Sequence, residues 1–345
     1  MLGYTKDKME SGSKIQQRSN STKGVLLKIV ISLSLFIWMV DRGLINLGDL
    51  KVFFGNASLV LSAFLFWLVG PIVLSAIRWK IILKNAGFLI SGSGAIRLQL
   101  IGVFFSSALP GSLGGDVMKS YFIVKQNKDA STTLALFSIL FDRIVGMFGL
   151  FLIGGIALAL NPSLILNNAS LLVVGAFVVG YLGCFVLLIV AMRYAYLRWK
   201  NSETQGKGLL AVVKRTILRF SIFASSMRNL MFSIILSFFA QLLSFVFFYY
   251  LYISIQHHPM WYSISDVAAI FPLGMMTTTL PISPGGLGVG HFAFSQLFDL
   301  AHLSGGATIF NAYFISQLLL NLLGVFSYIT ITSRDQRRQV GIANA

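Results

Sequence analysis

Apolar runs long enough to cross a lipid bilayer recur along the whole chain, separated by short polar stretches. A spanning helix needs about 20 mostly apolar residues. Six segments reach or approach this length, and each is expected to form one membrane-spanning helix: 24–40, 57–77, 134–160, 169–192, 230–255 and 309–331. The first segment is the shortest, so its span is expected to include flanking residues.

Two further apolar stretches are shorter and end on proline and glycine. One covers 96–109 and leads into the sequence LPGSLGGD, and the other covers 267–282 and leads into PISPGGLGVG. Short apolar runs suggest re-entrant or interfacial segments. Broken backbone at membrane depth is tolerated only inside protein or beside a wet cavity. We therefore expect two re-entrant or broken segments in addition to the six spans.

Composition supports a membrane protein and excludes a soluble one. Hydrophobic residues make up 56% of the 345 residues and charged residues only 11%, whereas soluble domains carry about 25% charged residues. The net charge of +16 comes from basic residues placed between the apolar runs. This distribution favours an anionic membrane surface over nucleic acid as the partner. The expected fold class is an all-α polytopic membrane protein.

Loop charges predict the orientation. Lys and Arg are concentrated in the N-terminal tail, the 78–84 turn, the 193–229 linker and the C-terminal tail, whereas 161–168 and 256–265 carry none. Because basic loops stay in the cytoplasm, both termini are expected there, in a multi-pass protein of the cell membrane. The domain assignment is a cytoplasmic tail at 1–24, one transmembrane domain at 25–331 and a second tail at 332–345.

This topology places the two broken segments at matching positions of two halves, 25–160 and 169–331. The first would enter from the cytoplasm and the second from outside, which is the pattern of an inverted-topology repeat with its binding site where the broken segments meet. The likeness of PGSLGG to PGGLG supports the repeat. Chance similarity is the alternative, since Gly and Pro are common in membrane helices.

Charges inside apolar segments are the sharpest functional signal, because a charge at the bilayer centre costs about 2.5–3.5 kcal/mol. Asp142 and Arg143 lie inside the third predicted span. Adjacent helical residues point about 100° apart, so each is expected to find a partner elsewhere. They would contact a headgroup or brace the site. The alternative is a position at the interface, with both side chains reaching out to water.

Other candidates surround the two Gly-rich turns. Asp116 and Lys119 follow the first turn, where exposed backbone N–H groups can cradle an anion, unless they are an ordinary helix cap and a solvated lysine. Arg78 beside Trp79 could bind phosphate or anchor the helix at the interface, and His291 follows the second turn. The full expected headgroup-binding set is Arg78, Arg97, Pro110, Gly111, Gly114, Gly115, Asp116, Lys119, Asp142, Arg143, Pro284, Gly285, Gly286, Gly288 and His291.

No catalytic constellation is present in the sequence. The glycines at 285–288 lack a βαβ context, and no GxxxxGK[ST], HExxH or GxSxG sequence occurs. We therefore expect no enzyme activity, no cofactor and no metal site.

The chain resembles the flippase-like transmembrane region of the lysylphosphatidylglycerol synthase family over about residues 25–330. The matching motifs are Arg78-Trp79-Lys80, LPGSLGGDV at 109–117, Asp142-Arg143 and SPGGLGV at 283–289. The resemblance implies a role in moving lipids between leaflets, in a stand-alone member without the soluble aminoacyl-transfer domain. The family often has a basic residue and then Glu where Gly290 and His291 stand here, and Arg near the position of Lys119.

The leading hypothesis is a translocase for a lipid or lipid-linked headgroup, with anionic membrane lipids as partners. A secondary transporter of a small solute is one alternative. Another is a non-transporting partner of a lipid-modifying enzyme or glycosyltransferase, docked through the 193–229 linker. A membrane-embedded enzyme is a further alternative.

Overall fold

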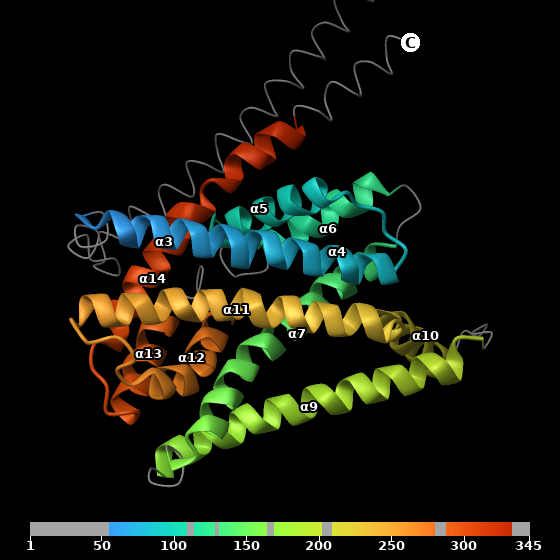
Figure 1. Cartoon of the computed structure of the whole chain (residues 1–345). Helices are drawn as coiled ribbons and strands as arrows, with labels where there is room; N and C mark the ends of the chain where they lie inside the picture. Colours follow the sequence, from blue (N-terminus) through green and yellow to red (C-terminus); the bar gives the residue numbers. More distant parts are fainter. Residues whose placement is uncertain are drawn as a thin grey trace, which may run out of the picture. The chain divides into compact units, whose positions relative to one another are not determined.

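The computed structural model describes residues 55–108, 114–127, 131–163, 169–201, 209–279 and 288–332, and these ranges contain helices and turns with no strand (Figure 1). Five of the helices are long and apolar enough to cross a membrane: Ala57–Asn85, Thr132–Leu160, Leu171–Trp199, Met227–Ile255 and Gly306–Thr332. They confirm five predicted spans and the all-α polytopic class. The first predicted span, 24–40, lies outside the described residues.

The first of these helices is longer than predicted and contains a π-helical segment. It consists of α3 (Ala57–Trp67), the π-helical Leu68–Leu74 and α4 (Ser75–Asn85). Pro71 inside the π segment has no N–H to donate, and its own carbonyl accepts a hydrogen bond from Gln99 Nε2 at 3.0 Å. The predicted turn at 78–84 is therefore wrong, because the wider π turn accommodates the proline and the helix continues to Asn85.

The first broken segment is a hairpin of two helices, α5 (Gly92–Ala108) and α6 (Gly114–Gln126). A Cβ on Gly115 would lie 2.0 Å from the carbonyl oxygen of Gly102, so the two backbones touch. Lys119 meets Gln99 one turn further along. The residue numbers of the contacts therefore increase along α6 while they decrease along α5, so the two helices are antiparallel. With 17 and 13 residues, neither is among the helices long enough to cross a membrane, and a pair of short antiparallel helices fits a re-entrant hairpin.

The second broken segment repeats this design with α12 (Ile264–Thr278) and α13 (Val289–Leu300). Gly274 of α12 faces the ring of Phe294, where a Cβ would approach within 2.4 Å. Gly288 precedes α13 with φ +76°, a left-handed conformation that glycine adopts without strain. The helix that follows, α14 (Gly306–Asn321), leads into the helical residues up to Thr332.

The remaining long helices are α7 (Thr132–Leu160), α9 (Ala169–Trp199) and α11 (Met227–Ile255). The predicted 193–229 linker is largely helical instead of a loop. It contains the last two turns of α9, the short helix α10 (Leu209–Ser221), the 3-10 turn Ile222–Ala224 and the start of α11.

Helix 57–85 runs antiparallel to α11. Ser58 Oγ lies 3.0 Å from Tyr250 Oη at one end, and Asn229 Nδ2 donates to Asn85 Oδ1 at 2.7 Å at the other. Each helix is followed directly by a re-entrant hairpin, so the hairpins enter from opposite ends of the pair. The order of long helix, hairpin and long helix occurs at 57–160 and again, inverted, at 227–332, within the predicted halves 25–160 and 169–331.

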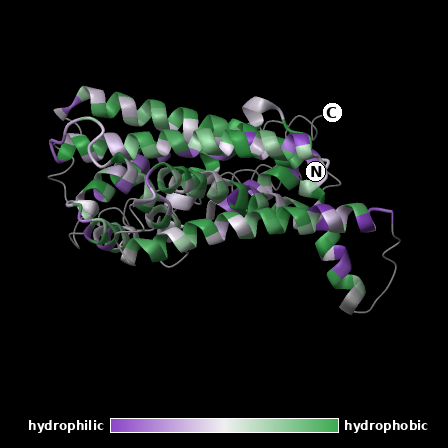
Figure 2. Cartoon of the chain, turned by 60° about the horizontal axis from the view of Figure 1, so that its bottom comes forward, coloured by the Kyte–Doolittle hydropathy of each residue, from purple (hydrophilic) through white to green (hydrophobic). Residues whose placement is uncertain are grey.

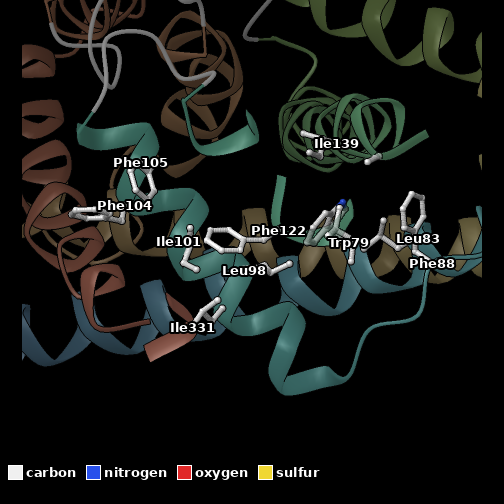
Figure 3. Packing of buried hydrophobic residues seen from close by; sticks show 12 residues of the cluster. Trp79, Leu83, Phe88, Leu98, Ile101, Phe104, Phe105, Phe122, Ile139 and Ile331 are labelled. Carbon is white, nitrogen blue, oxygen red and sulfur yellow. The ribbon is translucent and has the colours of Figure 1, made fainter. Parts of the chain in front are cut away.

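Apolar packing holds the first hairpin against its neighbours. Leu98 of α5, Phe122 of α6 and Trp79 of α4 belong to one buried cluster, and Figure 3 shows their side chains next to one another, with Ile139 of α7 close by. Figure 2 shows the long helices apolar along most of their length, with hydrophilic positions mainly toward the helix ends. Lipid-facing helices have this distribution.

Candidate functional site

Arg78 and Asp142 form a buried ion pair between α4 and α7. Arg78 Nε donates to Asp142 Oδ1 at 2.8 Å and Arg78 Nη2 donates to Asp142 Oδ2 at 3.0 Å. Their side chains are only 7% and 8% exposed. A two-pronged contact of this kind is the strongest arrangement for an arginine and a carboxylate. Arg78 is therefore neither an interfacial anchor nor open to solvent.

Small residues on α7 and α11 make room for the guanidinium. Arg78 Nη1 donates to Ser237 Oγ at 3.1 Å, and Ser237 Oγ donates to the carbonyl of Val145 at 2.7 Å. A Cβ on Gly146 would lie 3.3 Å from Arg78 Nη1, and one on Gly149 would lie 2.5 Å from Ser237 Oγ. The glycine spacing on α7 thus allows α4, α7 and α11 to meet around one buried cation.

The adjacent residue on α7 pairs with the tip of the first hairpin. Arg143 Nε lies 2.6 Å from Asp116 Oδ2, and their side chains are 31% and 19% exposed. Asp142 and Arg143 thus have different partners on different elements, as their 100° separation predicted. The first pair is sealed, whereas the second is open to its surroundings.

Lys119 is buried, which excludes the solvated lysine considered as an alternative. Its Nζ donates to Gln99 Oε1 at 3.0 Å and lies 4.2 Å from the centre of the Trp79 ring. A tryptophan face attracts a cation with a strength that increases on burial. Trp79 in turn donates from Nε1 to Ser138 Oγ at 3.2 Å. Gly102 leaves space for the lysine stem, since a Cβ there would lie 2.7 Å from Lys119 Cδ.

These groups form one electrostatic cluster. Lys119 interacts with both carboxylates, Asp116 and Asp142, and with both arginines, Arg78 and Arg143. Three cations and two carboxylates leave an excess of one positive charge among these five residues. An excess cation inside an apolar protein is costly unless an anion neutralises it, so the cluster, hereafter the charged cluster, is suited to an anionic group.

The remaining candidates of the first half lie on the helices of the first hairpin or outside the described residues. Gly114 begins α6 and Gly115 touches α5. Arg97 is half-buried on α5 and makes no ion pair within the described ranges. Pro110 and Gly111 lie outside those ranges.

In the second hairpin, the pair His291 and Asn311 corresponds to the ion pair of Asp116 and Arg143 in the first, with a hydrogen bond in place of the ion pair. His291 is the third residue of α13, as Asp116 is of α6. His291 Nε2 lies 3.2 Å from Asn311 Oδ1 on the next long helix, and the backbone N–H of Gly288 donates to His291 Nδ1 at 3.4 Å. The predicted Pro284, Gly285 and Gly286 lie outside the described residues. The contacts of His291 remain on its own half, and none of them joins the charged cluster.

Three polar residues of the site were missed by sequence reasoning: Gln99, Ser237 and Asn311. Each lies in an apolar helix. A search for polar side chains inside apolar segments, in addition to charged ones, would have found Gln99 and Asn311 as well. Ser237 carries no such signal, because a serine in an apolar helix commonly satisfies its hydroxyl within that helix, whereas here the hydroxyl donates to Val145 of α7.

The charged cluster and hairpins lie within the part of the chain that matches a known family. Residues 25–324 match the family model of the lysylphosphatidylglycerol synthase transmembrane region. Neither the curated proteins nor the solved structures include a match. Since the family match covers nearly the whole chain, the protein belongs to the family of the lysylphosphatidylglycerol synthase transmembrane region.

Proposed function

We propose that this protein translocates an anionic lipid or lipid-linked headgroup between the leaflets of the cell membrane. The observation that carries the proposal is the charged cluster at the tip of a re-entrant hairpin, with its excess positive charge. Membership of a membrane family supports a membrane substrate. Two hairpins entering from opposite ends of one helix pair are the kind of architecture that serves alternating access.

The sealed pair and the open pair have different roles in this proposal. Arg78 donates from Nε and Nη2 to Asp142 and from Nη1 to Ser237, so it braces α4, α7 and α11. Arg143, at 31% exposure, can exchange Asp116 for a headgroup phosphate. Hydrogen bonds from arginine to phosphate are charge-assisted and form in pairs, which compensates for the lost contact with Asp116.

Lys119 supplies the positive charge behind this exchange. It belongs to the same helix face as Asp116, about one turn further into α6, and its partners Gln99 and Trp79 are neutral. Among the described residues no carboxylate contacts its Nζ directly, so Lys119 adds to the positive charge of the cluster around the bound anion. The acyl chains would stay in the bilayer while the headgroup passes the cluster. The basic loops orient both termini and the first hairpin toward the cytoplasm.

Reconstituted vesicles containing fluorescent phosphatidylglycerol test the proposal. The rate at which label moves between leaflets is followed by chemical quenching from outside. Arg143→Gln should slow the movement about 10-fold or more, because one charge-assisted contact contributes roughly 1.5–3 kcal/mol. Lys84→Gln, which removes an exposed charge at the end of the same helix bundle, is the matched control and should leave the rate unchanged.

Two results would overturn the proposal. One is an unchanged rate in a folded Arg143→Gln protein. The other is movement of a soluble anion into vesicles without any movement of lipid, which would identify a solute transporter instead.

A further inference from the structure

The short helix α10 has an apolar face that the rest of the described protein leaves uncovered. Val212, Val213 and Ile217 are 48%, 45% and 40% exposed. At 100° per residue Val213 and Ile217 fall on one side of the helix and Arg215 and Arg219 on the other, while Val212 lies beside Arg219 and Lys214 beside Ile217. The helix is therefore amphipathic, and its apolar side at Val213 and Ile217 is not covered by the rest of the described protein.

The C-terminal end of α10 packs on the bundle through the same apolar side. The ring of Phe220 meets Phe137 and Phe141 of α7 edge-on, at centroid distances of 5.5 and 6.0 Å. Phe223, just after the helix, stacks on Phe141 at 5.5 Å. Lys214 Nζ lies 5.7 Å from the ring centre of Trp199 at the end of α9. Phe220 is seven residues after Val213 and so shares its side of the helix, which means that the apolar side meets the bundle at the C-terminal end of α10 and is uncovered before that end.

The location of α10 identifies what covers its apolar side. The helix joins the end of one candidate span, α9, to the start of another, α11 (Figure 1). It therefore lies at the boundary between bilayer and water. With 13 residues and three cations it is too short and too charged to span. A short helix with one apolar side and one basic side binds in the plane of an anionic bilayer surface.

We infer that α10 is an interfacial helix that binds the anionic lipids of the adjoining leaflet. Val213 and Ile217 enter the acyl-chain boundary. Lys214, Arg215 and Arg219 lie on the headgroup side, where they bind lipid phosphates. Each basic residue near such a surface contributes about 1 kcal/mol. This surface is separate from the charged cluster, and the inference does not depend on lipid translocation.

A fluorescent probe on full-length protein tests this inference directly. In a Cys184→Ser background, an Ile217→Cys variant is labelled with an environment-sensitive dye and reconstituted in vesicles of phosphatidylcholine with 0 to 40% phosphatidylglycerol. Spin-labelled lipids report contact with the acyl chains by quenching. Asn201→Cys, at an exposed position beyond α9, is the matched control. We expect strong quenching at position 217, increasing with phosphatidylglycerol, and weak quenching at 201.

A second experiment removes basic residues from α10. Lys214→Gln with Arg219→Gln should reduce the ratio of bound to free α10 about fivefold for each cation removed. Lys84→Gln with Arg198→Gln removes two charges outside α10 and should leave the quenching at position 217 unchanged. Quenching at 217 no greater than at 201, or independent of lipid charge, would overturn the inference. So would self-crosslinking of the unlabelled Ile217→Cys variant that excludes lipid, since a second copy would then cover α10.

Discussion

At the scale of single residues, each buried charge of the site is matched to a partner on a different element. Asp142 and Arg143 are neighbours in sequence, yet one holds α4 and the other holds the tip of the first hairpin. Lys119 has an amide and a tryptophan face instead of a carboxylate. The free-energy cost of burying a charge explains this arrangement, because an ionised group in an apolar interior is stable only when it is paired or hydrogen-bonded.

Removing one partner of the sealed pair should destabilise the protein strongly. Arg78→Met leaves the carboxylate of Asp142 buried without its cation, a change that costs about 3–5 kcal/mol. Combining it with Asp142→Leu should recover most of this loss, since no uncompensated charge remains. Thermal unfolding of the purified protein measures both effects.

The control for this pair is Lys84→Met, which removes an exposed charge from the same helix and should change stability by less than about 0.5 kcal/mol. A double variant as unstable as Arg78→Met would show that the pair contributes through some property other than charge compensation.

At the scale of elements, the helices of each hairpin approach through glycine. Gly115 of α6 touches the backbone of α5 at Gly102, and Gly274 of α12 holds the ring of Phe294. Small residues let membrane helices approach closely and gain dispersion energy where no hydrophobic driving force exists. The hairpins therefore depend on residues without a side chain to keep their tips inside the bundle.

A single methyl group at Gly115 should open the first hairpin. The Cβ of Gly115→Ala would lie 2.0 Å from the Gly102 carbonyl oxygen. The obstacle is backbone, so the helices must separate, at a cost of about 1–3 kcal/mol. We expect a lower unfolding temperature and slower lipid movement.

Gly180→Ala is the matched control, because nothing lies within 4 Å of a Cβ at that position of α9. Alanine is the better helix former, so stability should stay the same or rise. Equal effects of the two substitutions would contradict close packing of α5 on α6.

Much of this organisation could be predicted from the sequence, and the failures have physical reasons. Apolar length located the described spans and the two hairpins, because lipid demands about 20 apolar residues per crossing. The same rule ended the helix at 57–77 too early, since Arg78 looked like the start of a loop while its partner Asp142 lies 64 residues away. Pairing of distant charges leaves no local signal. The helix α10 was likewise read as a linker, because its cations conceal its apolar side.

At the scale of the whole molecule, the inverted order of helices has a directional consequence. Helix 57–85 and α11 run antiparallel, and each leads into its own hairpin. The turn after the first hairpin, near Asn127, and the loop before the second, near Met260, therefore belong to opposite ends of the bundle. Across a bilayer, these two positions face different compartments.

Accessibility labelling of single cysteines should place these two positions on opposite sides of the membrane. In a Cys184→Ser background, Asn127→Cys and Met260→Cys are treated with a membrane-impermeant thiol reagent in intact cells and in inside-out vesicles. Met260 is 69% exposed and lies in a loop without Lys or Arg, so its variant should react in intact cells. The Asn127 variant, next to the basic end of the bundle, should react only in inside-out vesicles.

Lys84→Cys, at the same end of helix 57–85 as Asn85, is the internal control and should react from the same side as the Asn127 variant. Reaction of the Asn127 and Met260 variants from one side would contradict the inverted repeat, because antiparallel helices of spanning length cannot lead into two hairpins on the same face.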